Sequence, residues 1–128
     1  MKTSVLIDSH GWIEYFSEGP KAQRYAAYIE SGQLYRLIVP SIVLYEVYKR
    51  LKSTKGETAA LEAIAHIIEH TETISVDQKT ALNAAEISLR TKLPMADAII
   101  KAVAEDNEAD LITGDPHFKN LPNVVFIE

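Results

Sequence analysis

Short apolar segments alternate with helix-like segments along the whole chain, and this alternation constrains the fold more than any other feature. Ser4–Ile7 and Leu37–Val39 are brief, almost wholly apolar runs, which is typical of strands buried on both faces. Further strands are expected at Thr73–Val76, Asp110–Thr113 and Val124–Ile127. Strands that alternate with helices predict right-handed crossovers and a mostly parallel sheet with helices on both sides. The sequence therefore predicts an α/β fold.

The segments between these strands carry helix signals. Helices are predicted over Gly11–Phe16, Lys21–Glu30, Ser41–Lys52 and Glu57–Glu69, after the capping residue Asp77, and from Pro94 onward. Helical spacing predicts an apolar stripe on each of the last three helices. The stripe of the helix over Glu57–Glu69 consists of Leu61, Ile64, Ala65 and Ile68, and that of the helix after Asp77 consists of Leu82, Ala85 and Leu89. In the helix that begins at Pro94, the residues expected to point inward are Met95, Ile99, Ala102 and Val103.

Length and composition set limits on the class of protein. The chain has 128 residues, which suits one domain over residues 1–128 that can bury its own core. It has no cysteine, which excludes disulfides, thiolate zinc sites and cysteine nucleophiles. No apolar run approaches the ~20 residues of a membrane span, and no signal peptide is visible, so a cytoplasmic protein without a membrane partner is expected.

The charge argues against nucleic-acid binding driven by the molecule as a whole. The formal net charge is −5, so a polyanion gains no long-range attraction. Basic residues nevertheless gather in one short stretch that contains Lys49, Arg50, Lys52 and Lys55. This stretch could contact phosphates locally, although it could equally be a solvated helix face.

Acidic residues from four distant segments are expected at one edge of the sheet. Asp8 directly follows the first strand, and Asp115 closely follows the fourth. Crossover helices run antiparallel to parallel strands, so Glu46 and Asp97, near the start of their helices, reach the same edge. Ligands of α/β folds bind at this carboxyl edge of the sheet. The sequence thus predicts that these four carboxylates converge.

Each of these acids also has an ordinary structural explanation. Asp8 could cap the next helix, and Asp115 stands in a favourable turn sequence. Glu46 could pair with Lys49 and Arg50, and Asp97 with Lys101. Only their joint placement favours a site. Carboxylates placed together repel one another unless a cation lies between them, and Mg²⁺ or Mn²⁺ prefers such oxygen ligands.

The segments that carry these acids resemble the PIN domain, and in size and order the VapC-type toxins of toxin–antitoxin pairs. The resemblance rests on the segments Val5-Leu6-Ile7-Asp8-Ser9, Pro40-Ser41-Ile42-Val43-Leu44-Tyr45-Glu46, Leu93-Pro94-Met95-Ala96-Asp97-Ala98 and Leu111-Ile112-Thr113-Gly114-Asp115. No single segment is specific, but all four occur in order across essentially the whole chain. The resemblance implies a three-layer α/β/α fold around a five-stranded parallel sheet in the order 3-2-1-4-5.

The resemblance also implies a function and a set of site residues. It implies a Mg²⁺- or Mn²⁺-dependent endoribonuclease with Asp8, Glu46, Asp97 and Asp115 as catalytic acids. We expect Asp8, Asp97 and Asp115 to bind the metal, and Glu46 either to bind it too or to align water. Ser9 and Thr113 would be supporting hydroxyls that orient carboxylates or water, and Lys49 and Arg50 are candidate RNA contacts.

The histidines and two aromatic residues are not part of the four-acid pattern. His10 occupies a position where the family often has Asn, and its role is open between a preserved hydrogen bond, a titrating group and a structural residue. Trp12 and Phe118 are expected in the core, and His117 at the surface. His66 and His70 share a helix face, but nothing near them in the sequence completes a zinc site.

The resemblance further implies partners. VapC-like toxins form homodimers and are silenced by a cognate VapB-like antitoxin. Two other readings stay open: a housekeeping RNA-processing nuclease of the same fold, and a non-catalytic PIN-like module that binds RNA or protein.

Overall fold

The computed structural model describes residues 2–128, so Met1, the first residue of the predicted domain, lies outside the described residues. The strands are β1 (Thr3–Ile7), β2 (Tyr35–Pro40), β3 (Glu72–Ile74), β4 (Asp110–Thr113) and β5 (Val124–Phe126). The helices are α1 (Ser9–Phe16), α2 (Ala22–Ile29), α3 (Ser41–Lys55), α4 (Glu57–His70), α5 (Gln78–Thr91) and α6 (Met95–Asp106), with a short 3₁₀ helix η1 (Pro116–Phe118).

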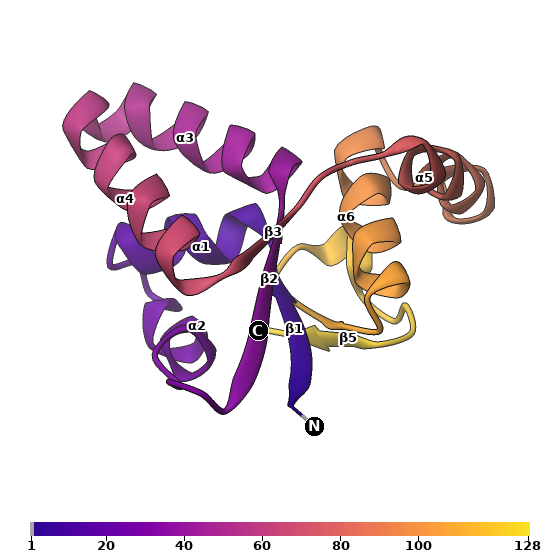
Figure 1. The fold of residues 1–128 in the computed structure, drawn as a ribbon, viewed down its shortest axis with the longest axis horizontal. Coiled ribbons are helices and arrows are strands. Elements are labelled where there is room, and N and C mark those ends of the chain that lie inside the picture. Colours follow the sequence, from indigo (N-terminus) through magenta and orange to yellow (C-terminus); the bar gives the residue numbers. More distant parts are fainter. Residues whose placement is uncertain (1) are drawn as a thin grey trace.

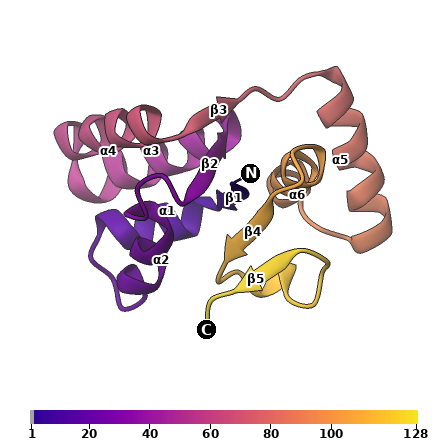
Figure 2. The same ribbon diagram turned by 60° about the horizontal axis from the view of Figure 1, so that its bottom comes forward.

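The strands form one parallel sheet in the order β3-β2-β1-β4-β5. Helices α1 to α4 cover one face of this sheet, while α5 and α6 cover the other (Figure 1). The segment after β3 carries the chain from the first helical layer to the second (Figure 2). The predicted three-layer α/β/α fold and its strand order are confirmed.

The core lies along the three central strands, β2, β1 and β4, and the helices packed on them. Leu6 of β1 pairs with Ile38 on one side and Leu111 on the other, and all three side chains are buried. The predicted core residues Trp12 and Phe118 are fully buried. The parallel register of these strands, with Leu6 opposite Ile38 and Ile7 opposite Ile112, brings their carboxyl ends to one edge of the sheet.

The buried face of α4 differs from the expected one. Of the predicted stripe, Leu61, Ala65 and Ile68 are exposed and only Ile64 is partly buried. The helix instead buries Ala60, Ala63 and Ile67. Small alanine side chains allow α4 to pack closely on α3, which turns the larger apolar residues outward.

The same correction applies to α5 and to the start of α6. Leu82, Ala85 and Leu89 are exposed, because α5 packs on α6 through Thr80, Ala84 and Ile87. Met95 was expected to point inward but is 74% exposed, because it is the first residue of α6. Ile99, Ala102 and Val103 do pack inward as predicted.

Strand β3 covers Glu72–Ile74 rather than Thr73–Val76, and its short length fits its place at the edge of the sheet. Within residues 2–128, none of the helices has the length and apolar character needed to cross a bilayer.

Candidate active site

The sheet topology brings the four predicted acids to one edge. β1 and β4 are parallel neighbours, so Asp8, which follows β1, lies beside the residues that follow β4, including Asp115. Helices α3 and α6 both start at this edge, with Glu46 in the second turn of α3 and Asp97 in the first turn of α6. The four carboxylates are close enough to influence one another electrostatically.

Asp8 is held in place from two sides. Its side chain caps α1 by accepting a hydrogen bond from the Gly11 N–H at 2.9 Å, and its other oxygen accepts one from the Thr113 hydroxyl at 2.5 Å. Only 4% of the residue is exposed, and this burial raises its pKa to about 6, although both hydrogen bonds oppose the rise. Asp8 is thus fixed in geometry while its ionised form is disfavoured.

Thr113 links two of the acids. Its hydroxyl donates to Asp8 and accepts a hydrogen bond from the Asp115 N–H at 3.0 Å. The residue is fully buried. A β-branched side chain at the end of a central strand has little rotational freedom, so Thr113 fixes the distance between the two segments.

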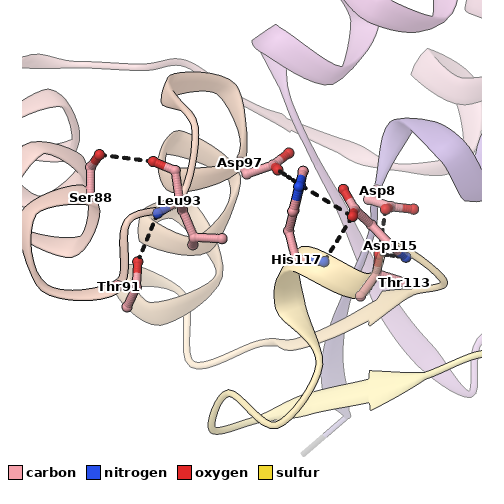
Figure 3. Close-up of polar contacts among 8 residues, drawn as sticks. All are labelled: Asp8, Ser88, Thr91, Leu93, Asp97, Thr113, Asp115 and His117. Carbon is pink, nitrogen blue, oxygen red and sulfur yellow. Dashed lines mark hydrogen bonds and ion pairs between the residues drawn. The ribbon is translucent and has the colours of Figure 1, made fainter.

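Asp97 and Asp115 meet around the imidazole of His117 (Figure 3). The His117 Nδ1 atom lies 3.0 Å from the Asp97 Oδ2 atom and 3.3 Å from the Asp115 Oδ1 atom. Burial raises the pKa of Asp97, with a further contribution from the Asp115 charge, while the hydrogen bond with His117 lowers it. These three side chains offer ligand atoms that all lie within 4.8 Å of one another.

Glu46 completes the cluster from α3. Burial raises its pKa, and repulsion from Asp97 and Asp115 adds to the rise, while the Ser9 hydroxyl beside it offsets part of it. Its Oε1 atom is buried and has no hydrogen-bond partner among residues 2–128. A buried carboxylate oxygen without a donor is unfavourable, and a bound cation would satisfy it.

The ion pairs that could have explained Glu46 and Asp97 are not formed among residues 2–128, although Asp97 does occupy the first turn of α6, where the helix dipole favours an acid. Lys101, four residues after Asp97, is buried and donates instead to the Pro122 carbonyl at 2.9 Å. Lys49 lies over the ring of Tyr45, 5.6 Å from its centre. In the described chain, neither Glu46 nor Asp97 forms an ion pair with a lysine or arginine.

The turn before α6 sets the position of Asp97. Lys92 ends α5 in the left-handed conformation with φ of 67°. The Ser88 hydroxyl then donates to the Leu93 carbonyl at 2.8 Å, and the Leu93 N–H donates to the Thr91 hydroxyl at 3.3 Å (Figure 3). These bonds fix where α6 begins and therefore where its first-turn carboxylate points.

The donor set fits a divalent cation. Carboxylate oxygens dominate it, sulfur is absent from it, and one imidazole nitrogen lies among the oxygens. Oxygen ligands with few nitrogens are typical of Mg²⁺ and Mn²⁺ sites. Burial raises the pKa of Asp97 and Glu46, and the repulsion that adds to this rise would be relieved by such an ion.

Sequence reasoning missed one residue of this cluster. His117 was expected at the surface, and it is 60% exposed, yet it contacts two of the acids. Its position two residues after Asp115, in a turn opened by Pro116, was the available signal. Lys49, Arg50 and His10 are exposed.

Comparisons with known proteins give a consistent result. The family model described as PIN domain matches residues 5–124. A toxin–antitoxin complex from Klebsiella pneumoniae contains a similar chain, with 25% identity, a TM-score of 0.77 and coverage of 94% of this chain and 95% of that one. No curated protein matches the sequence.

Two further solved structures are similar in fold. VapBC2 from Rickettsia felis, bound to a promoter DNA fragment, has 15% identity and a TM-score of 0.76, with 98% of each chain covered. VapC20 from Mycobacterium tuberculosis, a sarcin-ricin loop cleaving toxin, has 18% identity and a TM-score of 0.70, with 83% of this chain and 85% of that one covered.

Proposed function

This chain belongs to the PIN domain family, and from that premise we propose that it is a Mg²⁺- or Mn²⁺-dependent endoribonuclease that acts as the toxin of a VapBC-type toxin–antitoxin pair. One observation carries the proposal: carboxylates from four separate segments share one edge of the sheet, where burial raises the pKa of Asp8, Glu46 and Asp97 and the neighbouring Asp115 charge adds to each rise. Such an arrangement is unfavourable for folding alone and is favourable once a divalent cation is bound. The span of the family match supports a single PIN-like domain over residues 1–128.

We assign the roles by position in the cluster. Asp8, Asp97 and Asp115 would hold the metal ion, and Glu46 would either join them or align the attacking water. When bound, the ion would supply charge stabilisation at the phosphodiester and acidify a water molecule. Thr113 would hold Asp8 and the Asp115 backbone in register, as its two hydrogen bonds suggest. Ser9 would hold the Glu46 carboxylate in place through a hydrogen bond from its hydroxyl.

The proposed reaction is hydrolysis with no covalent enzyme intermediate. The water oxygen forms a bond to phosphorus as the bond to the 3′ oxygen breaks in line with it. The departing oxygen takes a proton from solvent water, and the products are a 3′-hydroxyl and a 5′-phosphate. The anionic side chains orient the water and accept its proton, so none of them acts as a nucleophile.

RNA is the proposed substrate. The structural similarity to a toxin that cleaves the sarcin-ricin loop supports this choice. Lys49 and Arg50 are exposed on α3, the helix that carries Glu46, so they could contact phosphates on either side of the scissile bond. Since the net charge is −5, such local contacts must hold the RNA.

We also propose two protein partners. Similar chains occur in complexes with antitoxins, which supports a VapB-like antitoxin as one partner. A second copy of this chain is the other, and the exposed Leu82 and Leu89 on α5 support a surface covered in a homodimer. We propose a cytoplasmic location because the proposed substrate is found there.

The test is cleavage of total RNA by the purified protein, with and without EDTA. We expect defined cleavage sites bearing 5′-phosphates in Mg²⁺ or Mn²⁺, and none in EDTA or with Asp97→Asn. Asp77→Asn, an exposed helix cap far from the cluster in sequence, is the matched control and should cleave like the wild type. RNA that stays intact under all conditions would favour the non-catalytic PIN-like module.

Expression in bacteria separates the toxin from a housekeeping nuclease. A toxin should arrest growth unless its antitoxin is supplied, and Asp97→Asn should relieve the arrest. Harmless overexpression of an active nuclease would favour a housekeeping role in RNA processing.

A further inference from the structure

The imidazole of His117 occupies a position that the four-acid pattern does not explain. Its Nδ1 atom lies 3.0 Å from one carboxylate oxygen and 3.3 Å from another, so it sits between Asp97 and Asp115 (Figure 3). The two carboxylates are 17% and 28% exposed, whereas the imidazole is 60% exposed. His117 therefore closes the outer side of the carboxylate pair.

The backbone directs this side chain toward the acids. Asp115 caps η1 by accepting a hydrogen bond from the His117 N–H at 2.9 Å. The next residue, Phe118, is fully buried in the core. With Phe118 anchored inward and the preceding turn closed by Asp115, the side chain of His117 is held over the cluster rather than left free in solvent.

We propose that the His117 Nδ1 atom is a nitrogen ligand of the divalent cation held by Asp97 and Asp115. The inference rests on the proposed metal-dependent function and adds a ligand to it. Neighbouring ligand atoms on an octahedral ion with bonds of about 2.1 Å lie about 3 Å apart. The separations of Nδ1 from the Asp97 and Asp115 oxygens, 3.0 and 3.3 Å, are close to that spacing. As a ligand, Nδ1 uses its lone pair, so the ring proton is on Nε2.

A nitrogen ligand changes the metal that the site prefers. Imidazole suits first-row transition metals such as Mn²⁺, whereas Mg²⁺ strongly favours oxygen. The site should therefore bind Mn²⁺ more tightly than a site made of carboxylates alone. The competing explanation is that His117 only donates a hydrogen bond that holds Asp97 and Asp115 together.

Electron paramagnetic resonance of bound Mn²⁺ distinguishes the two explanations without any activity measurement. The whole protein, freed of metal with EDTA and dialysed, is titrated with MnCl₂, and electron spin echo modulation reports any directly bonded nitrogen. We expect nitrogen modulation in the wild type and its loss in His117→Gln. We also expect Mn²⁺ affinity to fall by about tenfold in that variant, and Mg²⁺ affinity, measured by competition, to fall much less.

His10→Gln is the matched control, because it removes the other exposed imidazole beside the acids. The control should keep the nitrogen modulation. Bound Mn²⁺ without nitrogen modulation, or modulation that survives His117→Gln, would overturn the inference and leave the carboxylate site standing. A wild type that binds no Mn²⁺, or binds it as well after Asp97→Asn, would instead overturn the proposed function. The exposure of His117 means that its replacement leaves no core cavity, and circular dichroism checks the fold.

Discussion

Replacing Asp8 with asparagine should stabilise the protein while abolishing its activity. In the metal-free protein, burial raises the pKa of Asp8 from an ordinary value of 3.8 to about 6. Between these two pH values the folded state binds more protons than the unfolded state. The free energy of unfolding therefore falls as the pH rises through this interval, and the loss is complete above about pH 6. At 1.36 kcal/mol for each tenfold change in proton affinity, the loss reaches about 3 kcal/mol.

Asparagine removes this loss because it carries no charge and has nearly the same shape. Its amide oxygen can accept the Gly11 N–H, and its amide nitrogen can donate to the Thr113 hydroxyl oxygen. We expect Asp8→Asn to raise the free energy of unfolding at pH 7.5 by up to about 3 kcal/mol, which is roughly 10 °C in Tm. Well below pH 3.8 the two proteins should be equally stable, because the carboxyl is then protonated in both states.

Denaturant unfolding in EDTA at several pH values measures this difference. The control is Asp77→Asn, the same change at a helix cap with an equivalent hydrogen bond of 2.9 Å. Asp77 is exposed and its pKa is lowered by its hydrogen bonds to Thr80, so its replacement should give no stabilisation at neutral pH. An Asp8→Asn variant that is no more stable than the wild type at pH 7.5, or whose advantage does not change with pH, would refute the reasoning.

Substitutions at three other places test separate features of the structure. Thr113→Val should lower the free energy of unfolding by about 1–3 kcal/mol, because it leaves the Asp115 N–H and the Asp8 Oδ2 atom without their hydrogen-bond partner. Thr113→Ser should restore most of this loss, and equal denaturation midpoints for Thr113→Val and the wild type would contradict the reasoning. Gly11→Ala should lower the free energy of unfolding by about 1–3 kcal/mol, because the added Cβ would lie 2.5 Å from the Tyr25 Cε1 atom. An unchanged Tm would count against so tight a contact. Replacing Lys49 and Arg50 with Gln should reduce the slope of log binding constant for RNA against log salt concentration by about 1.4. The slope is measured on the inactive Asp97→Asn protein. The same change at Lys79 and Lys92 is the control and should leave the slope as it was.

The convergence of the acids was predictable because it follows from topology. In a parallel sheet the carboxyl ends of strands meet the amino ends of crossover helices, so Asp8 and Asp97 share an edge whatever the details of packing. Strand positions were predictable for a related reason, since β1 and β2 are buried on both faces and read as continuous apolar runs. These features depend on local sequence and chain direction alone.

The orientation of the outer helices was not predictable in this way. The sequence of α4 offers two faces, one with Leu61 and Ile68 and one with Ala60 and Ala63. Hydrophobic periodicity favours the face with larger side chains, but packing on α3 selects the face that allows the closer approach. Choosing between them requires the distance between two helices, which no local pattern contains.

The contact made by His117 was hidden for a similar reason. Its distance from Asp97, 20 residues away, depends on how the turn after β4 meets the start of α6. Both segments were placed at the same edge, but the direction of one side chain depends on the capping of a three-residue helix and on the burial of Phe118.

Anomalous diffraction from crystals grown with MnCl₂ tests the central claim most directly. We predict an anomalous difference peak for a manganese ion that lies about 2.0–2.3 Å from carboxylate oxygens of Asp97 and Asp115. The peak should be absent from crystals grown in EDTA. A map from millimolar Mn²⁺ that shows well-ordered acids with no peak among them would contradict the account.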